Sequence, residues 1–146
     1  MTATMDLGLV KSLVQKQSCF SQLTPKEIDE LATLFIEKRI PAGATIVTEA
    51  DPVDSVYLIV SGTADVRHIT IENGKTHVQS LATLNAGDAI GLNETGFYSL
   101  SGMRTATVVA NTEMVVLRLS VAAFHGFALI NTHVTEVMRK NAENLE

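Results

Sequence analysis

The chain has 146 residues, of which 46% are apolar and 18% are charged, a balance that excludes a disordered or low-complexity chain. Its 16 acidic and 11 basic residues give a formal net charge of −5, which argues against a nucleic-acid partner and anionic lipid. The single cysteine, Cys19, excludes a disulfide framework and a four-cysteine metal site. No apolar run suits membrane insertion, and the N-terminus lacks signal-peptide features. We therefore expect one cytoplasmic domain over residues 1–146.

Two helices are predicted at about residues 5–36. Apolar residues recur at helical spacing before residue 18, which indicates a short amphipathic helix. A second helix should begin at Thr24, because this hydroxyl can cap it, Glu27 can complete a capping box and Pro25 sits where no N–H is needed. The apolar face of that helix consists of Ile28, Leu31, Ala32 and Phe35.

Short runs of β-branched and aliphatic residues follow at about residues 40–119, separated by turn residues, as is typical of strands. The predicted strands are Thr45–Thr48, Val56–Ser61, Thr63–Ile71, Thr76–Leu84, Thr105–Ala110 and Met114–Leu119. Two further helices are predicted at about residues 120–143 from the helical spacing of apolar residues. These residues are Phe124, Phe127, Val134, Val137, Met138 and Leu145.

One hairpin is predicted in detail, around Asn73-Gly74. A type I′ turn needs positive φ at both central residues, which this pair adopts at low cost. Pairing outward from the turn sets Ile69 opposite Val78 and Val66 opposite Leu81. The inward-facing parity switches between those two pairs, which predicts a bend or bulge and a sheet that rolls up on itself.

The segment 85–108 carries the candidate chemistry. It is rich in glycine and ends in Arg104, directly before a predicted strand. A glycine-rich turn presents backbone N–H groups to an anion, and a guanidinium can grip two oxygens of one phosphate. The alternative is that Arg104 is a solvated loop residue and the glycines only make turns.

Several segments together resemble a known family. They are Phe20–Ile28 with Leu31, then Gly43, Ile46, Glu49, Asp51, Val56, Tyr57, Ile59 and Gly62, and finally Gly87–Gly91 and Arg104–Val108. Over residues 20–138 the chain resembles the cyclic nucleotide-binding domain family. The resemblance implies a mainly β fold, an eight-stranded antiparallel β-roll (jelly-roll-like, a double-stranded β-helix) with flanking N- and C-terminal α-helices. It also implies that the last helix closes over bound cAMP or cGMP.

The resemblance places the ligand at seven positions, which are Gly91, Leu92, Asn93, Glu94, Arg104, Thr105 and Ala106. It implies that Arg104 holds the exocyclic phosphate oxygens. It also implies that Thr105 bonds the phosphate or a guanine edge, a slight preference for cGMP. Gly91 would begin the phosphate-binding cassette.

The sequence departs from the family pattern at three places. Leu92 stands where the family has a glutamate on the ribose 2′-hydroxyl, and leucine cannot accept that proton. Glu94, ten residues before Arg104, is the candidate replacement. The cassette is longer than usual, and Ala50 replaces a glycine between Glu49 and Asp51.

The expected function is therefore a cyclic nucleotide sensor that acts on an effector domain, a partner protein or a second copy of the chain. No enzymatic activity and no cofactor beyond the nucleotide are expected. A second hypothesis is a degenerate domain that has lost its ligand and serves in protein interaction. A third is a cupin-type metal site built from His68, His77, His125 and His133, although no His-x-His motif occurs. Cys19 is expected to be buried, and Asp88 to cap a turn.

Overall fold

The computed structural model of the chain describes residues 6–93, 96–97 and 102–143. The N-terminal helical elements are α1 (Leu7–Gln15), a short 3-10 helix η1 (Ser18–Phe20) and α2 (Pro25–Ala32). The strands are β1 (Ile36–Ile40), β2 (Thr45–Val47), β3 (Ser55–Ser61), β4 (Ala64–Glu72), β5 (Lys75–Leu84), β6 (Ala89–Ile90), β7 (Leu92–Asn93), β8 (Gly96–Phe97), β9 (Thr107–Ala110) and β10 (Met114–Ser120). The chain continues with α3 (Val121–Ile130) and α4 (Thr132–Glu143).

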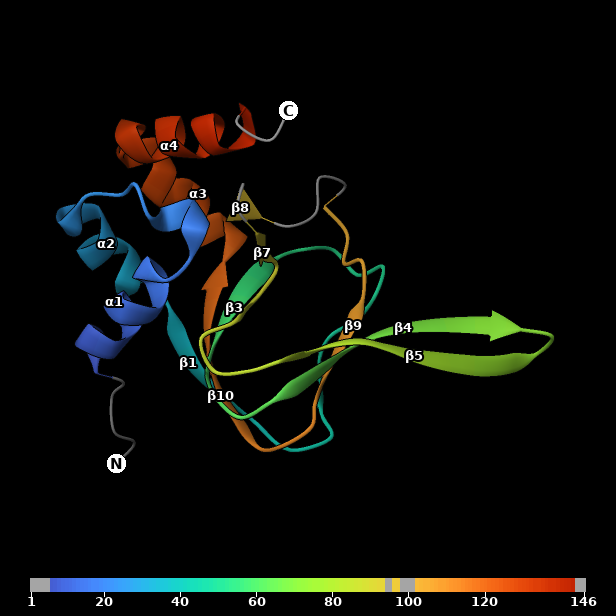
Figure 1. Ribbon diagram of the computed structural model, residues 1–146. Coiled ribbons are helices and arrows are strands. Elements are labelled where there is room, and N and C mark those ends of the chain that lie inside the picture. The colour runs from blue at the N-terminus through green and yellow to red at the C-terminus, as the bar shows by residue number, and fades with distance from the viewer. Residues whose placement is uncertain (1–5, 94–95, 98–101, 144–146) are drawn as a thin grey trace.

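Two four-stranded antiparallel sheets build the roll, with strand orders β1-β10-β3-β6 and β2-β9-β4-β5, while β7 and β8 form a separate pair. The four helices gather on one side of the strands (Figure 1). The predicted eight-stranded antiparallel roll with flanking helices is confirmed, and so are the six predicted strands, although β9 begins at Thr107 rather than Thr105.

The sequence prediction missed β1 and the short strands of the cassette. The centre of β1 is Glu37-Lys38-Arg39, which has no apolar alternation, and this strand is defined by its pairing with β10. Strand β6 has two residues, too few for a periodic pattern, and pairs with β3 through Tyr57 and Ile90. Both elements depend on partners far away in the sequence, which local propensity does not register.

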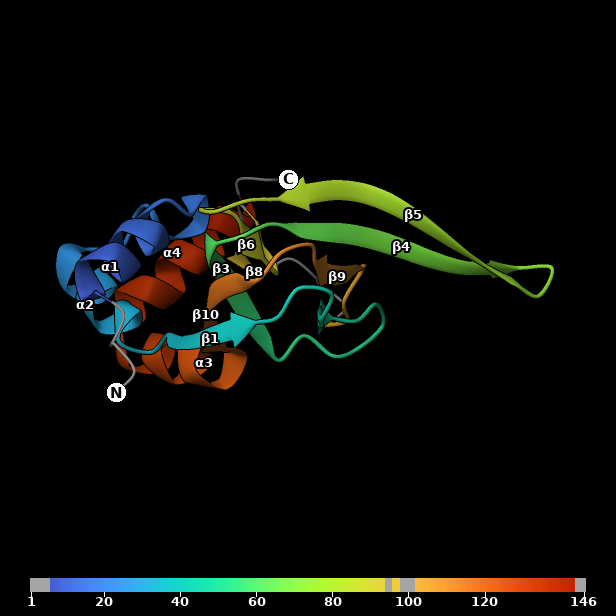
Figure 2. The same ribbon diagram turned by 90° about the horizontal axis from the view of Figure 1, so that it is seen from below.

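The predicted hairpin joins β4 and β5. Asn73 and Gly74 have φ of 53° and 76°, as the turn requires. Ile69 lies opposite Val78 as predicted, but Val66 pairs with Ala82, so its predicted pairing with Leu81 is wrong. The register shifts between Val66 and Arg67, which confirms the predicted bulge and leaves Leu81 as the extra residue. The outer part of the hairpin projects beyond the rest of the domain (Figures 1 and 2).

The largest hydrophobic cluster joins the helices to one sheet. Its members come from α1, η1, α2, α3 and α4 and from strands β3 and β10, and the rings of Phe20 and Phe124 lie 5.9 Å apart within it. Cys19 is buried there as predicted, and burial raises the pKa of its thiol to about 12. This thiol is therefore protonated and inert at neutral pH.

Leu145, which was predicted on the last helix, lies outside the described residues. None of the described helices is long and apolar enough to cross a membrane.

The helix starts follow the predicted capping chemistry. The Thr24 N–H donates to Glu27 Oε1 over 2.8 Å, and the Glu27 N–H donates to Thr24 Oγ1 over 3.2 Å, which is the predicted capping box. Asp88 also acts as predicted, since its Oδ2 accepts from the Asn85 N–H over 2.8 Å.

Glu27 also ties the C-terminal helix to α2. His133, in the first turn of α4, lies with Nδ1 2.8 Å from Glu27 Oε1 and 3.0 Å from Oε2. At the other end of α4, the Asn141 amide donates to the Cys19 carbonyl over 2.9 Å. Two polar contacts therefore supplement the buried Val134 and Val137 in holding α4 against the N-terminal helices.

The Glu27–His133 contact predicts a pH dependence of stability. Burial opposes ionisation of Glu27, but the Thr24 N–H and His133 outweigh it and hold its pKa below the ordinary 4.5. A depressed carboxyl pKa contributes stability above the unfolded pKa, and that contribution is lost as pH falls through the folded pKa. Glu27→Gln should therefore lower the free energy of unfolding at about pH 5.5, and the difference from wild type should shrink at about pH 3.

Urea unfolding at the two pH values measures this difference. Glu136→Gln is the control, because Glu136 lies on α4, the helix that carries His133, and its side chain is half-exposed and takes no part in the Glu27–His133 contact. The control should follow the wild-type pH profile. An equal loss for Glu27→Gln at both pH values would show that the ionised carboxylate does not stabilise the fold.

Candidate functional site

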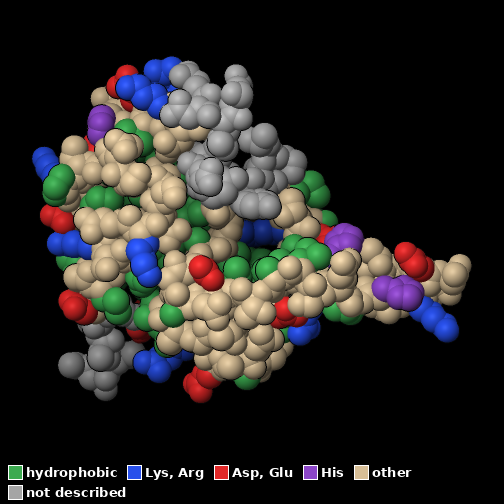
Figure 3. Space-filling model, in the orientation of Figure 1, with side chains coloured by type: hydrophobic (Ala, Val, Ile, Leu, Met, Phe, Trp, Pro, Cys, Tyr) green, Lys and Arg blue, Asp and Glu red, His purple; other side chains and the backbone are tan. Residues whose placement is uncertain are grey.

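A cavity of about 500 Å³ opens inside the roll, beside the β7–β8 pair. Figure 3 shows a hollow in this face of the molecule, with hydrophobic side chains around it and a basic group within. Its aliphatic wall consists of Val47, Val53, Val66, Leu81, Leu84, Ile90, Leu92 and Val108. Arg104 and Thr105 are the polar side chains that line it within the described part of the chain. The cavity is therefore apolar with one cationic side, which suits an anion attached to an apolar body.

Arg104 supplies that charge from a buried position. The residue is 8% exposed, and its Nη2 donates to the Ser55 carbonyl over 2.7 Å. The same nitrogen lies 3.9 Å from Asp54 Oδ1, on a largely exposed carboxylate. Burial lowers the pKa of Arg104, and nearby Tyr57 and Asp54 partly oppose the shift. An arginine nevertheless stays protonated, so the cavity carries a fixed positive charge shielded from water.

The backbone of Arg104 is clamped by the turn that follows β2. The Ala50 N–H donates to the Arg104 carbonyl, and the Arg104 N–H donates to the Asp51 carbonyl, each over 2.8 Å. The turn is anchored in its own right, because the Glu49 N–H donates to Thr107 Oγ1 over 3.0 Å and the Glu49 carboxylate lies 2.8 Å from Nδ1 of His68 on β4. These contacts hold the main chain of Arg104 in place, and the bond to the Ser55 carbonyl holds its guanidinium.

Gly91 gives the guanidinium its space. The residue has φ of 89°, a left-handed conformation that glycine adopts without strain. A Cβ at this position would lie 3.0 Å from Arg104 Nη1 and 3.1 Å from Val56 Cγ1. Both the backbone angle and the close approach of Arg104 therefore require glycine here.

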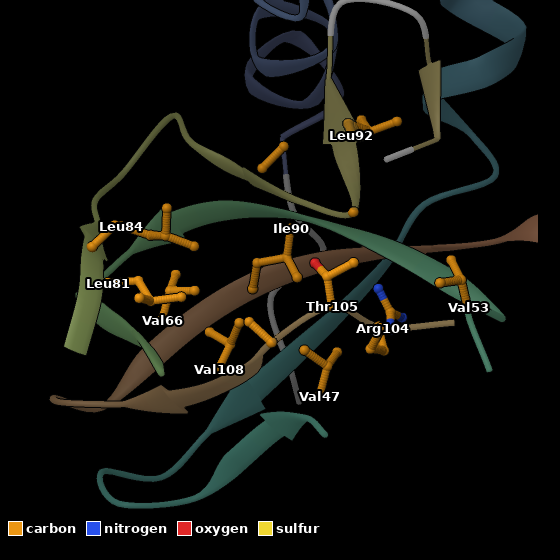
Figure 4. Close-up of a pocket in the computed structure, with 14 residues that line it drawn as sticks. Val47, Val53, Val66, Leu81, Leu84, Ile90, Leu92, Arg104, Thr105 and Val108 are labelled. Carbon is orange, nitrogen blue, oxygen red and sulfur yellow. The ribbon is translucent and has the colours of Figure 1, made fainter. Parts of the chain in front are cut away.

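The apolar side of the cavity is built by the hairpin and the facing strands. The bulge residue Leu81 lines the cavity with Val66 and Leu84, at a distance from Arg104 and Val53 (Figure 4). Leu92 also lines the cavity, and it packs against the helical core cluster. Leu92 thus connects the cavity with the helices, a position from which a ligand could act on them.

The structure brings together five of the seven predicted site residues, namely Gly91, Leu92, Arg104, Thr105 and Ala106, which all line the cavity. Asn93 follows Leu92 in β7, and Glu94 lies outside the described residues. Sequence reasoning missed the aliphatic wall and the Ser55 carbonyl. The apolar residues of the paired strands were a usable signal for the wall, whereas a backbone carbonyl leaves no trace in the sequence.

The histidines are dispersed. His68 contacts Glu49, His133 contacts Glu27, and His77 lies 3.9 Å from Glu72 on the same hairpin. Over residues 6–93, 96–97 and 102–143, no three His, Cys, Asp or Glu side chains lie close enough together to hold a metal ion. The described residues give the cupin hypothesis no support.

Ala50, whose N–H holds the Arg104 carbonyl, has a strained backbone conformation that can be tested. Its φ is 74°, and a left-handed conformation costs a residue with a Cβ about 1–2 kcal/mol. Ala50→Gly should therefore stabilise the fold by about 1 kcal/mol, after allowance for the greater freedom of glycine in the unfolded chain. Thermal unfolding should show a midpoint about 2–4 °C higher. Ala42→Gly is the control. Ala42 lies in an exposed turn and does not have a positive φ, so this substitution should lower the melting midpoint. A lower melting midpoint for Ala50→Gly would argue against backbone strain at Ala50.

Two curated relatives cover much of the chain. The cAMP-dependent protein kinase regulatory subunit of Aspergillus niger is 28% identical over 132 residues, which span 90% of this chain and 29% of the relative. The regulatory subunit of the same kinase from Colletotrichum orbiculare is 34% identical over 106 residues, which span 70% of this chain and 24% of the relative. The chain thus spans less than a third of the length of these relatives.

A solved structure confirms the fold. The N-terminal domain of a transcriptional regulator from Streptomyces coelicolor A3(2) superposes with a TM-score of 0.75 at 21% identity, over 90% of this chain and 88% of that domain. The family profile described as "Cyclic nucleotide-binding domain" matches residues 37–131. Since this match covers more than half of the sequence, from the second residue of β1 to the end of α3, the chain belongs to the cyclic nucleotide-binding domain family.

Proposed function

We propose that the chain is a sensor domain that binds cAMP or cGMP in the cavity beside Arg104 and relays binding through its C-terminal helix. The observation that carries this proposal is a guanidinium 8% exposed at the wall of a cavity of about 500 Å³. A buried positive charge at a cavity wall favours the binding of an anionic ligand. The volume of the cavity falls in the range of pockets that bind small molecules. Family membership and the named relatives support the nucleotide as that ligand.

The proposed pose follows the polarity of the cavity. The cyclic phosphodiester lies against Arg104 and the backbone at Gly91, where charge-assisted hydrogen bonds contribute about 1.5–3 kcal/mol each. The base lies against the aliphatic wall around Val66, Leu81 and Leu84. In this pose the Thr105 hydroxyl, which faces the cavity (Figure 4), is within reach of the phosphate or base.

The proposed relay runs from the β7–β8 pair to the helices. Leu92 packs on the helical cluster, and α4 lies next to β8. A ligand shifts the position of α4 only if it binds more tightly to one arrangement than to another. We propose that contact with Leu92 provides this difference, and that the effector is a further domain, a partner protein or a second copy of the chain.

Calorimetry with purified protein tests the binding proposal. Titration with cAMP and titration with cGMP should each give a heat of binding that saturates at one nucleotide per chain. Adenosine shares the base and sugar of cAMP but has no phosphate to meet Arg104, so it is the matched control and should not saturate the site. Equal affinity for adenosine and cAMP would contradict phosphate recognition.

A second candidate function is a domain of this fold that no longer binds nucleotide. It is favoured by Leu92, an aliphatic side chain at the cavity wall where the family pattern has a ribose-binding glutamate. A ligand at 100 times its dissociation constant stabilises the native state by about 2.7 kcal/mol and so raises the melting temperature. No thermal shift with millimolar cAMP or cGMP would support this second candidate and contradict the first.

A further inference from the structure

The projecting hairpin leaves one edge of the roll uncovered. Strand β5 is the outermost strand of the sheet β2-β9-β4-β5, and no other strand pairs with its outer side within the described part of the chain. Residues 75–83 of this strand are all exposed. In both ribbon views the tip of the hairpin stands clear of the other elements (Figures 1 and 2). Alternate N–H and C=O groups of β5 therefore point into solvent.

This edge lacks the usual protection against pairing. Natural edge strands are blunted by lysine, proline, inward charges or bulges. From Thr76 to Leu84 the strand has no Lys, Arg, Asp, Glu or Pro. The bulge falls at Leu81, at the inner end, so Lys75–Ser80 runs in regular register against β4. Five residues, Thr76–Ser80, thus form a regular edge that lacks these protecting features and is open to another strand.

One face of the same hairpin is apolar. Ile69 and Val78 lie directly opposite each other, and Ile71 lies two residues further along β4 on the same face. Their exposed fractions are 40%, 58% and 75%. The apolar row therefore reaches the outer edge of the sheet at Val78.

We propose that the edge of β5 pairs antiparallel with β5 of a second copy of this chain, around a twofold axis at Val78. The occupant follows from symmetry and charge. A twofold axis perpendicular to the sheet makes a strand antiparallel to its own copy. With Val78 opposite Val78 of the second copy, Lys75 faces Leu81, so no like charges meet. The apolar row then continues across four strands, as Ile69, Val78 and their counterparts.

Analytical ultracentrifugation of the whole chain over a series of concentrations tests the pairing. The wild type should show a concentration-dependent monomer–dimer equilibrium. Val78→Lys and Val78→Glu each place like charges on the axis, and each should raise the dissociation constant about tenfold or more. An equimolar mixture of the two variants should restore the dimer, because opposite charges then face each other. Val78 is 58% exposed, so neither variant should lower the melting temperature of the monomer appreciably.

Ile71→Lys is the matched control, since Ile71 is 75% exposed on the same face but one strand away from the edge. It should still dimerise. If Ile71→Lys disrupts the dimer as much as Val78→Lys does, the two hairpins pack face to face and the proposed edge pairing is wrong. A wild type that stays monomeric to its solubility limit, or a mixture that fails to dimerise, also overturns the proposal. These measurements need no nucleotide and stand apart from the binding test.

Discussion

Arg104→Ala should weaken the binding of cAMP and cGMP about 30-fold to 900-fold, which corresponds to about 2–4 kcal/mol for a desolvated charged contact. The guanidinium is buried and bonded to the Ser55 carbonyl, and among the described residues that line the cavity Arg104 is the only cation. Arg104→Lys should recover part of the affinity, because an ammonium keeps the charge but not the planar two-pronged donor. Calorimetry with both nucleotides measures these differences.

Arg118→Ala is the control for that experiment. Its Nη2 lies 3.8 Å from Asp54, much as Arg104 lies 3.9 Å from the same side chain, but Arg118 does not line the cavity. Loss of Arg118 should leave the affinity within a factor of about three, as expected for a partly exposed ion pair. Unchanged affinity in Arg104→Ala, with a wild-type melting profile, would remove Arg104 from the binding site.

Gly62→Ala should lower the free energy of unfolding more than Gly43→Ala does. Gly62 follows β3 with φ of 92°. A Cβ there would lie 2.6 Å from the Glu113 carbonyl oxygen and 2.7 Å from Met114 Cγ. The left-handed conformation costs about 1–2 kcal/mol, and overpacking adds about 1–3 kcal/mol. The free energy of unfolding should therefore fall by about 2–5 kcal/mol.

Gly43→Ala separates the two causes. Gly43 has φ of 86°, but a Cβ there would meet nothing within 4 Å. This variant should lose only the conformational part, about 1 kcal/mol, after allowance for the smaller freedom of alanine in the unfolded chain. Urea unfolding of both variants gives the comparison. Equal losses would mean that the turn before β10 moves aside without cost and that Gly62 is not held by close packing.

The sequence predicted the elements whose signals are local. The Asn73-Gly74 turn and the Thr24–Glu27 capping box are encoded in neighbouring residues, and both have the predicted geometry. The bulge was also predicted from the parity switch between the pairs it separates. Its exact place was not predicted. Pairing outward from the turn carries a single register through both strands and sets Val66 opposite Leu81, whereas the extra residue shifts the register and sets Val66 opposite Ala82.

The candidate site was predictable only in part. Its glycines and Arg104 could be identified as an anion site from the sequence, while the nucleotide came from the family resemblance. The clamp could not be predicted, because it depends on backbone groups of Ala50 and Asp51 and on the contact between Glu49 and His68, 19 residues apart. The aliphatic wall left a signal in the apolar residues of the paired strands, but which of them line the cavity depends on the bulge between β4 and β5.

The most direct test of the account is a titration of the ¹⁵N-labelled chain with cAMP followed by amide NMR. The largest shift changes should fall on the backbone amides of Gly91, Arg104, Thr105 and Ala106, and the Arg104 side-chain Nε–H should move with them. In Arg104→Ala the same shift changes should require about 30-fold to 900-fold more cAMP. Saturating shifts centred on the helices, with the cavity amides unmoved, would place the ligand elsewhere and contradict a cyclic phosphate held by Arg104.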